Sequence, residues 1–223
     1  MNIIRPSSPL RKSEVGEAVE DYQQQLQDSE VALGYLHGRG LEADAIAKAK
    51  LGYVEHPRQG HEKARHRIAI PYHSTTGAVQ IRFRAIGDSE PKYLGLAGDS
   101  TRLYNAHTLA EHPNGDTAYI CEGEMDTIIC HHVLDLKPAV GVAGIQAWKP
   151  HYKHLLEGFQ NIIILCDNDD KGQGDKFGDE LMEVFSGQDV RKVLMPTGFD
   201  VNSAYLDGGK HLIDWIQGSF DSP

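Results

Sequence analysis

Two aspartates follow a short apolar run in the stretch 161–174, NIIILCDNDDKGQG. Asp167 and Asp169 are alternate residues at or just past the end of the run, so their carboxylates can converge on one point. Oxygen ligands crowded in this way suit a hard divalent cation, in the first place Mg²⁺. The alternative is that the segment is only a polar turn between a strand and a helix, because acidic residues near a helix N-terminus are stabilising in any case.

The surrounding sequence predicts the elements that would hold these carboxylates. A wholly apolar run is typical of a strand buried on both faces. From residue 118 onward, strands alternate with helices, which predicts a parallel sheet with right-handed crossovers and helices on both faces. We expect strands at 118–121, 139–143, 161–166 and 190–195, and helices at 127–134, from the loop 144–150 to about 156, and at 175–186.

More polar residues fall at the ends of other strands of this sheet. Glu122 follows the first strand, and Asp200 and Asn202 lie just past the fourth. The carboxyl ends of parallel strands share one edge, so these side chains are expected to face one crevice. Ionised carboxylates at such short range repel each other, and a bound cation relieves that repulsion. Glu122 could instead take up a proton and act as a general acid or base.

The first hundred residues have a different pattern. After a loose tail over 1–12, apolar residues at helical spacing predict helices at 14–27, 29–38 and 41–50, which we interpret as a small helical subdomain. The runs 67–72 and 78–86 flank a turn-rich segment and predict a β-hairpin, followed by a short extended piece at 91–94.

Arginines alternate with apolar residues along the second strand of that hairpin. Val79, Ile81 and Phe83 share one face, and Arg82 and Arg84 lie on the other. The arginine face is either a solvated outer surface or a surface that binds anions.

Composition by itself is neutral on function, because the acidic chain contains a locally basic segment at 61–105. The formal net charge of −10 argues against indiscriminate coating of nucleic acid. The three cysteines are far apart and form no CxxC pair, so we expect free thiols, an intracellular protein and no zinc. We also expect no membrane association, because no apolar run approaches about 20 residues. With neither a GxxxxGK[ST] nor a GxSxG motif, the acids and the upstream basic residues favour phosphoryl or nucleotidyl transfer.

The order of these motifs resembles a known family. Glu122-Gly123-x-x-Asp126, Asp167-x-Asp169 and Asp200-x-Asn202 are similar to the topoisomerase–primase (TOPRIM) domain. The upstream blocks YLHGRGLEADAIAKAKLGY, RIAIPY, GAVQIRFRAI and PKYL resemble the catalytic core of bacterial-type and bacteriophage DNA primases. The implied fold class is α/β, a TOPRIM Rossmann-like parallel sheet preceded by a small mixed α+β subdomain. The expected limits are a tail and helix at 1–28, a primase-type subdomain at 29–115, the TOPRIM domain at 116–215 and a tail at 216–223.

The resemblance also implies roles for individual residues. Glu122, Asp167 and Asp169 would be catalytic metal ligands for Mg²⁺ or Mn²⁺, with Asp200 and Asn202 as further ligands. Asp126 and Asp200 would support a second metal or the incoming triphosphate. Asn202 departs from the cellular form, in which an aspartate is usual, and phage helicase–primases resemble the chain more closely there. The basic residues that would hold nucleotide or nucleic acid are Arg65, Arg67, Arg82, Arg84 and Lys92.

The implied activity is template-directed synthesis of short RNA primers on single-stranded DNA from ribonucleoside triphosphates. Partners would include a replicative helicase or a separate zinc-binding or helicase protein, in the bacterial cytoplasm (that of the host if the protein is phage-encoded). The chain could be a core, a split primase or a protein that initiates without zinc. A TOPRIM nuclease and a non-catalytic replication accessory protein are the alternatives that remain open.

Overall fold

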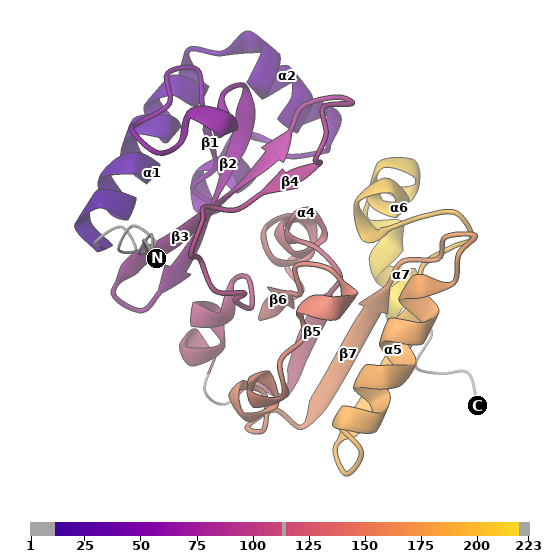
Figure 1. Ribbon diagram of the computed structural model, residues 1–223. Coiled ribbons are helices and arrows are strands. Elements are labelled where there is room, and N and C mark those ends of the chain that lie inside the picture. The colour runs from indigo at the N-terminus through magenta and orange to yellow at the C-terminus, as the bar shows by residue number, and fades with distance from the viewer. Residues whose placement is uncertain (1–11, 113–114, 219–223) are drawn as a thin grey trace. The chain divides into compact units, whose positions relative to one another are not determined.

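The computed structural model describes residues 12–112 and 115–218 (Figure 1). Contacts within the chain divide it into two compact units. Unit 1 contains the described residues up to Gly38 together with Glu42–Thr101, and unit 2 contains Arg39–Leu41 and the described residues from Arg102 onward. The expected limits at residues 28, 115 and 215 are not tested by this division and stay predictions. The predicted N-terminal tail lies outside the described residues, except for Lys12, which begins a helix.

Unit 1 is an antiparallel sheet with helices packed on it. Its strands follow the order β1-β2-β3-β4, and the predicted hairpin is confirmed as β2 paired with β3. In chain order the elements are α1 (Lys12–Gln27), α2 (Glu30–Gly38), α3 (Ala43–Lys48), β1 (Gly52–Tyr53), a 3₁₀ turn (Glu62–Ala64), β2 (Arg67–Ser74), β3 (Gly77–Ala85) and β4 (Tyr93–Leu94).

The interpretation of the first three helices as a helical subdomain is wrong. Val15, Val19 and Tyr22 of α1 share one buried cluster with Ile81 and Phe83 of β3, so the first helix covers the sheet. The apolar stripe of α1 predicts a buried face but not its partner, because helix and sheet surfaces both satisfy such a stripe.

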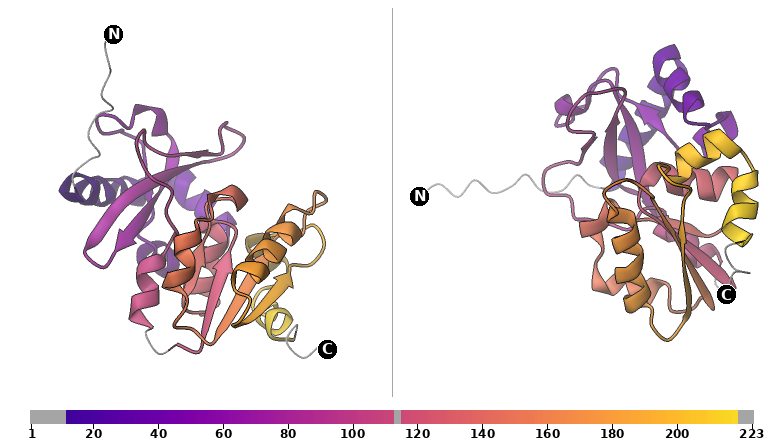
Figure 2. Two further views of the ribbon diagram at one scale, coloured as in Figure 1. Left: turned by 60° about the horizontal axis from the view of Figure 1, so that its bottom comes forward. Right: turned by 90° about the vertical axis from the view of Figure 1, so that its right-hand side faces the viewer.

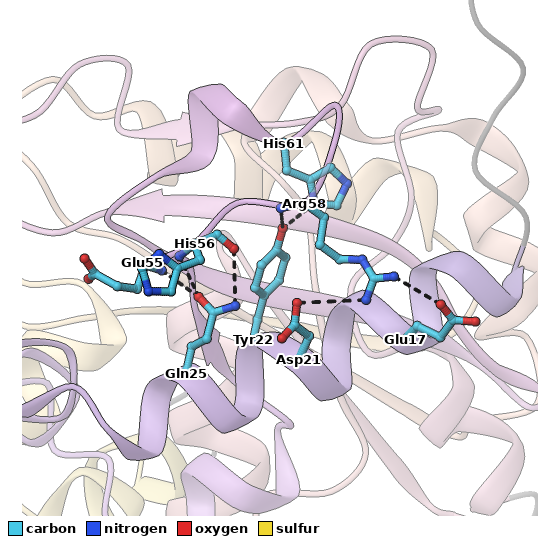
Figure 3. Close-up of polar contacts among 8 residues, drawn as sticks. All are labelled: Glu17, Asp21, Tyr22, Gln25, Glu55, His56, Arg58 and His61. Atoms are coloured by element: carbon cyan, nitrogen blue, oxygen red, sulfur yellow. Dashed lines mark hydrogen bonds and ion pairs between the residues drawn. The ribbon is translucent and has the colours of Figure 1, made fainter.

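Polar contacts fasten α1 to the segment between β1 and β2 (Figure 3). The Gln25 side-chain oxygen accepts the backbone N–H groups of Glu55 and His56 at 2.9 and 2.8 Å. The Tyr22 hydroxyl accepts the N–H of Arg58 at 3.1 Å and lies 2.7 Å from His61 Nδ1. This irregular segment is therefore held by hydrogen bonds from the helix, which satisfy its backbone groups in the absence of a strand partner.

Unit 2 has the predicted parallel sheet, with strand order β6-β5-β7-β8. Its elements are a 3₁₀ turn (Ala106–Glu111), β5 (Thr117–Cys121), α4 (Glu124–Ile128) continued as a π-helical turn (Ile129–Val133), β6 (Ala139–Gly141), 3₁₀ turns (Ile145–Ala147 and Pro150–Leu155), β7 (Asn161–Cys166), α5 (Gln173–Val184), β8 (Asp189–Leu194), α6 (Val201–Gly208) and α7 (His211–Gly218).

Helices cover both faces of this sheet. The right-hand view of Figure 2 shows α5 on one side of the strands and α6 and α7 on the other. Ile162 and Ile164 of β7 pack in one cluster with Phe177 and Leu181 of α5. Ile163 points to the opposite face and is 4% exposed, so β7 is buried on both faces, as its continuous apolar run predicts.

Several local predictions need correction. The helix expected to end near 156 is a pair of 3₁₀ turns, and α6 and α7 were not predicted from the sequence. Residues 216–218, expected in the C-terminal tail, belong to α7, and the rest of that predicted tail lies outside the described residues. Within the described ranges, no helix is both long and apolar enough to cross a membrane.

Candidate functional site

The ends of two neighbouring strands of unit 2 bring Glu122 and Asp167 together. β5 and β7 run parallel with Cys121 opposite Leu165, so the residues that follow them meet at one edge. Glu122 Oε1 accepts the backbone N–H of Asp167 at 2.8 Å. The predicted convergence of the acidic motifs at the strand ends is thus visible as a direct contact.

Gly174, in the first turn of α5, makes room for this contact. A Cβ atom at this position would lie 2.2 Å from the Asp167 carbonyl oxygen and 2.4 Å from Glu122 Oε1. Both distances are far below van der Waals contact, so only glycine lets α5 approach the two acids this closely. Gly174 is the last residue of the stretch 161–174, and this role was not predicted from the sequence.

Asp126 and Asp200 meet at the first turn of α6. Asp126 Oδ1 accepts the backbone N–H of Asn202 at 3.0 Å. Asp200 is the N-cap of α6, and its Oδ1 accepts the N–H of Ser203 at 2.6 Å. Two carboxylates therefore satisfy backbone donors that would otherwise lack partners at the helix start.

Burial and mutual repulsion shift the proton affinity of two of these acids. Burial, followed by the charges of Asp126, Glu122, Asp200 and Asp169, raises the pKa of Asp167 to about 8. Burial raises the pKa of Glu122 to about 7, although its bond to the Asp167 N–H opposes the shift. All five acids predicted at this edge thus interact electrostatically. Asp170, by contrast, is exposed.

These acids have the chemistry of a site for a hard divalent cation. Asp167 Oδ1 is buried and has no hydrogen-bond partner, which leaves an oxygen lone pair without a donor. A cation would satisfy that oxygen and relieve the repulsion that raises the two pKa values. Among residues 12–112 and 115–218, however, no three acidic, histidine or cysteine side chains already form a metal-ligand cluster. Binding would therefore require these side chains to move closer together.

Asn202, predicted as a further ligand, has a different environment. Its side chain is 1% exposed, and its Oδ1 accepts a hydrogen bond from Arg39 Nη1 at 3.0 Å. Arg39 lies in the block YLHGRGLEADAIAKAKLGY, and its contact with Asn202 was not predicted from the sequence. A contact between residues 163 positions apart leaves no periodic signal in one sequence.

The basic residues of unit 1 include a buried guanidinium, that of Arg84, which is 5% exposed. Arg84 Nε donates to the Tyr35 hydroxyl at 2.6 Å, and Nη1 donates to the Tyr93 hydroxyl. Tyr93 faces Arg84 across the β3–β4 ladder, and its ring centroid lies 5.1 Å from Arg84 Cζ and 4.9 Å from Arg82 Cζ. The interpretation of this strand face as a solvated surface is therefore wrong for Arg84.

The other predicted basic residues of unit 1 differ in exposure. Arg67 is 6% exposed, and its Nη1 donates to the Pro91 carbonyl oxygen at 2.7 Å. Arg82 is half-buried, whereas Arg65 and Lys92 are exposed. Arg67 thus fixes the segment before β4, and the exposed pair is accessible to a large ligand.

Comparison with known proteins assigns the family. A model of the Toprim-like family matches residues 119–205, which include Glu122, Asp167 and Asp200. The gene 57 protein of Mycobacterium phage D29 is 38% identical over 148 residues, covering 64% of this chain and 92% of the phage protein. This chain belongs to the TOPRIM-containing family of bacterial-type and bacteriophage primase cores. The family predicted from the sequence is therefore confirmed.

Cellular members of the TOPRIM primase family are more distant and longer. The DNA primase of Legionella pneumophila is 27% identical over 88% of this chain, and that of Clostridium acetobutylicum is 27% identical over 90%. The chain spans 41% and 33% of the lengths of these two primases.

Solved structures confirm the fold class. The Aquifex aeolicus primase structure, which contains zinc-binding and RNA polymerase domains, matches 94% of this chain and 62% of its own with a TM-score of 0.75 and 19% identity. A DnaG primase catalytic domain bound to single-stranded DNA matches 90% of this chain and 78% of its own, with a TM-score of 0.69 and 21% identity. At these identities the likeness establishes the arrangement of elements.

Proposed function

We propose that this chain carries the catalytic core for template-directed synthesis of short RNA primers on single-stranded DNA. The observation that carries the proposal is the half-buried Asp167 carboxyl, which is repelled by four neighbouring acids and whose buried Oδ1 has no hydrogen-bond partner. Family membership supports the same reaction class, because the matched cellular proteins are DNA primases.

The five acids at the ends of β5 and β7 and around the start of α6 are called the acidic edge below. We propose that the acidic edge binds Mg²⁺ or Mn²⁺ through Glu122, Asp167 and Asp169, with Asp126 and Asp200 supporting a second ion or the triphosphate. The bound ion would supply charge neutralisation at phosphate oxygens and activation of an attacking hydroxyl. The residues of the chain set the geometry. The α6 cap holds two of the carboxylates, and Gly174 lets α5 lie against the other pair.

Glu122 has a second proposed capacity at this edge. Its pKa of about 7 lets the carboxyl exchange a proton near neutral pH, which suits general acid or base catalysis. Oε1 already accepts the Asp167 N–H, so the contact holds the carboxyl in one orientation. This placement allows Glu122 to act as a metal ligand or as a proton acceptor.

The basic residues of unit 1 are proposed to bind phosphates of nucleotide or nucleic acid. A guanidinium can bind two phosphate oxygens at once, and Arg84 has Nη2 without a hydrogen-bond partner among residues 12–112 and 115–218. Arg65 and Lys92 are exposed and would add charge attraction, and Arg67 and Arg82 are proposed to add further positive charge. The proposed partners are a single-stranded DNA template, ribonucleoside triphosphates and a replicative helicase or separate zinc-binding protein in the bacterial cytoplasm.

The test is incubation of the chain with labelled ribonucleotides, a single-stranded DNA template and Mg²⁺ or Mn²⁺. Template-dependent oligoribonucleotides are expected from the native chain, and none from the variant Asp167→Asn. Asp170→Asn is the matched control, because Asp170 lies in the same turn but is exposed, and it should retain synthesis. Shortening of the template without new RNA would contradict the proposal in favour of a nuclease, and absence of any product would contradict it outright.

A further inference from the structure

The carboxamide of Asn202 uses both of its polar atoms on one residue. Asn202 Oδ1 accepts from Arg39 Nη1 at 3.0 Å, and Asn202 Nδ2 donates to the backbone carbonyl oxygen of Arg39 at 2.7 Å. Asn202 is 1% exposed and Arg39 is half-buried, so the Asn202 ends of both bonds are shielded from water. Breaking either one leaves a buried polar atom unsatisfied, which costs more than an exposed hydrogen bond contributes.

The segment Arg39–Leu41 is fitted to α6 around this pair. Gly40 has φ +76°, and a Cβ there would lie 2.6 Å from Tyr205 Cε1. Leu41 is fully buried. The segment belongs to unit 2 although α2 and α3, which precede and follow it, belong to unit 1. Arg39 is thus held in place by its neighbours as well as by Asn202.

The same asparagine is tied to the acidic edge through its backbone. Its N–H donates to Asp126 Oδ1, and the next N–H of α6 donates to Asp200 Oδ1. The first turn of α6 therefore contacts Arg39 through the Asn202 side chain and two acids through its backbone. A displacement of this turn would move both carboxylates.

The two bonds with Arg39 require one acceptor and one donor on the same side chain. A carboxamide provides both, whereas an aspartate provides only acceptors. Aspartate could accept from the guanidinium, but it would place its second oxygen against the Arg39 carbonyl. The hydrogen-bond pattern thus favours asparagine over aspartate at position 202.

We infer that Arg39 and Asn202 are positioning residues, which fix the first turn of α6 and hold Asp126 and Asp200 at the acidic edge. Asn202 is then not a metal ligand. This inference rests on the proposed metal site. It reassigns one of the residues predicted as a ligand.

The experiment measures two quantities without nucleotide or template. Titration calorimetry gives the Mn²⁺ affinity, and thermal unfolding gives the melting temperature. The variants of the full chain are Arg39→Ala, Asn202→Ala and the double variant. Each single variant should lower the melting temperature by about 2–8 °C, and the double variant should cost less than the sum because the pair is broken once. Arg191→Ala, an exposed arginine of the same unit, is the control and should change neither quantity.

The sign of the Arg39→Ala effect on metal binding discriminates between the two roles. Loss of a positive charge near a cation site tightens cation binding by electrostatics alone. A positioning role predicts the opposite, about 10-fold weaker Mn²⁺ binding in Arg39→Ala and Asn202→Ala. Arg39→Lys should recover part of it, because lysine keeps a donor to Asn202 Oδ1. Unchanged or tighter binding in Arg39→Ala would overturn the inference.

Asn202→Asp gives an independent answer with the fold least disturbed. The added negative charge would strengthen Mn²⁺ binding if Asn202 were a ligand, and also by electrostatics alone if Asn202 had no positioning role. The inference predicts a lower melting temperature and no gain in affinity, and a gain would overturn it. Glu122→Gln with Asp167→Asn separates this result from the proposed function. If that double variant binds Mn²⁺ as well as the native chain does, the proposed metal site at the acidic edge is wrong. The melting temperatures of the Arg39 and Asn202 variants would still test the Arg39–Asn202 pair.

Discussion

Units 1 and 2 each hold an ionisable group in a shielded place without an opposite charge beside it, a base in unit 1 and an acid in unit 2, with different consequences. In unit 1, Arg84 has two phenol hydroxyls and an aromatic face as its neighbours. In unit 2, Asp167 has other carboxylates as its neighbours and one oxygen without a donor. Among the residues that the structure describes, neither side chain forms an ion pair.

The two groups differ in how their surroundings shift the pKa. Burial lowers the pKa of Arg84, but the phenol oxygens outweigh it and the pKa is raised, so the guanidinium stays charged. Asp167 has no such compensation and instead retains a proton up to a pH of about 8. Unit 1 is therefore prepared for an anion at any ordinary pH, whereas unit 2 becomes fully anionic only when a cation arrives. Four predictions test this contrast.

The largest effect is expected from removing the carboxylates. Asp167→Ala and Asp169→Ala should each reduce primer synthesis by about 100-fold or more, because each removes a proposed ligand and with it several kcal/mol of transition-state stabilisation. Circular dichroism should show a folded chain in both. Full synthesis in both variants would contradict the assignment of these acids as metal ligands. The segment after β7 would then be only a polar turn that contains a protonated carboxyl.

The counterpart in unit 1 is Arg84→Gln. We expect binding of a single-stranded oligonucleotide to weaken by about 10-fold, with the slope of log affinity against log salt reduced by about 1. Fluorescence anisotropy over a salt series measures both quantities. Lys48→Gln is the control, because Lys48 is exposed and already paired with Asp44. An unchanged salt slope in Arg84→Gln would mean that Arg84 only supports the fold.

The pH dependence of stability should separate the two charge types. Glu122 and Asp167 hold protons in the folded state at pH values where the unfolded chain has released them, so their contribution falls as pH rises from about 4 to about 8. Without metal, we expect the melting temperature to fall by about 5 °C across this window. Glu122→Gln with Asp167→Asn should flatten that decline, and Mg²⁺ should reverse it at pH 8. A decline of equal size in this double variant would assign the effect to other groups.

The smallest effect is expected from Tyr93→Phe. This change removes one hydroxyl from Arg84 but keeps the ring that both arginines contact. Oligonucleotide binding should weaken about 2- to 5-fold, in keeping with one hydrogen bond to a charged group. Tyr53→Phe, which removes a phenol bonded to His66, is the matched control. Equal affinities of Tyr93→Phe and the native chain would show that the ring alone positions Arg84.

The sequence was most informative where local pattern decides structure. The four strands of unit 2 and the acids at their ends follow from apolar runs and chain direction, because parallel strands must end at one edge. Arg84 shows the opposite case. Its alternation with apolar residues identifies the strand face correctly, but the cover supplied by Tyr35 comes from a helix 49 residues away. The Arg39–Asn202 pair was likewise inaccessible, since no period links two residues so far apart.

The close approach of α5 at Gly174 allows the acidic edge to be disturbed by a mutation that leaves every acid in place. A single added methyl group would collide with Glu122 Oε1 and the Asp167 backbone while every acid of the edge stays in the chain. Gly174→Ala is therefore a way to disable the site by shape alone, without altering formal charge. It separates the electrostatic field of the carboxylates from their ability to come together, which no substitution of an acid can do.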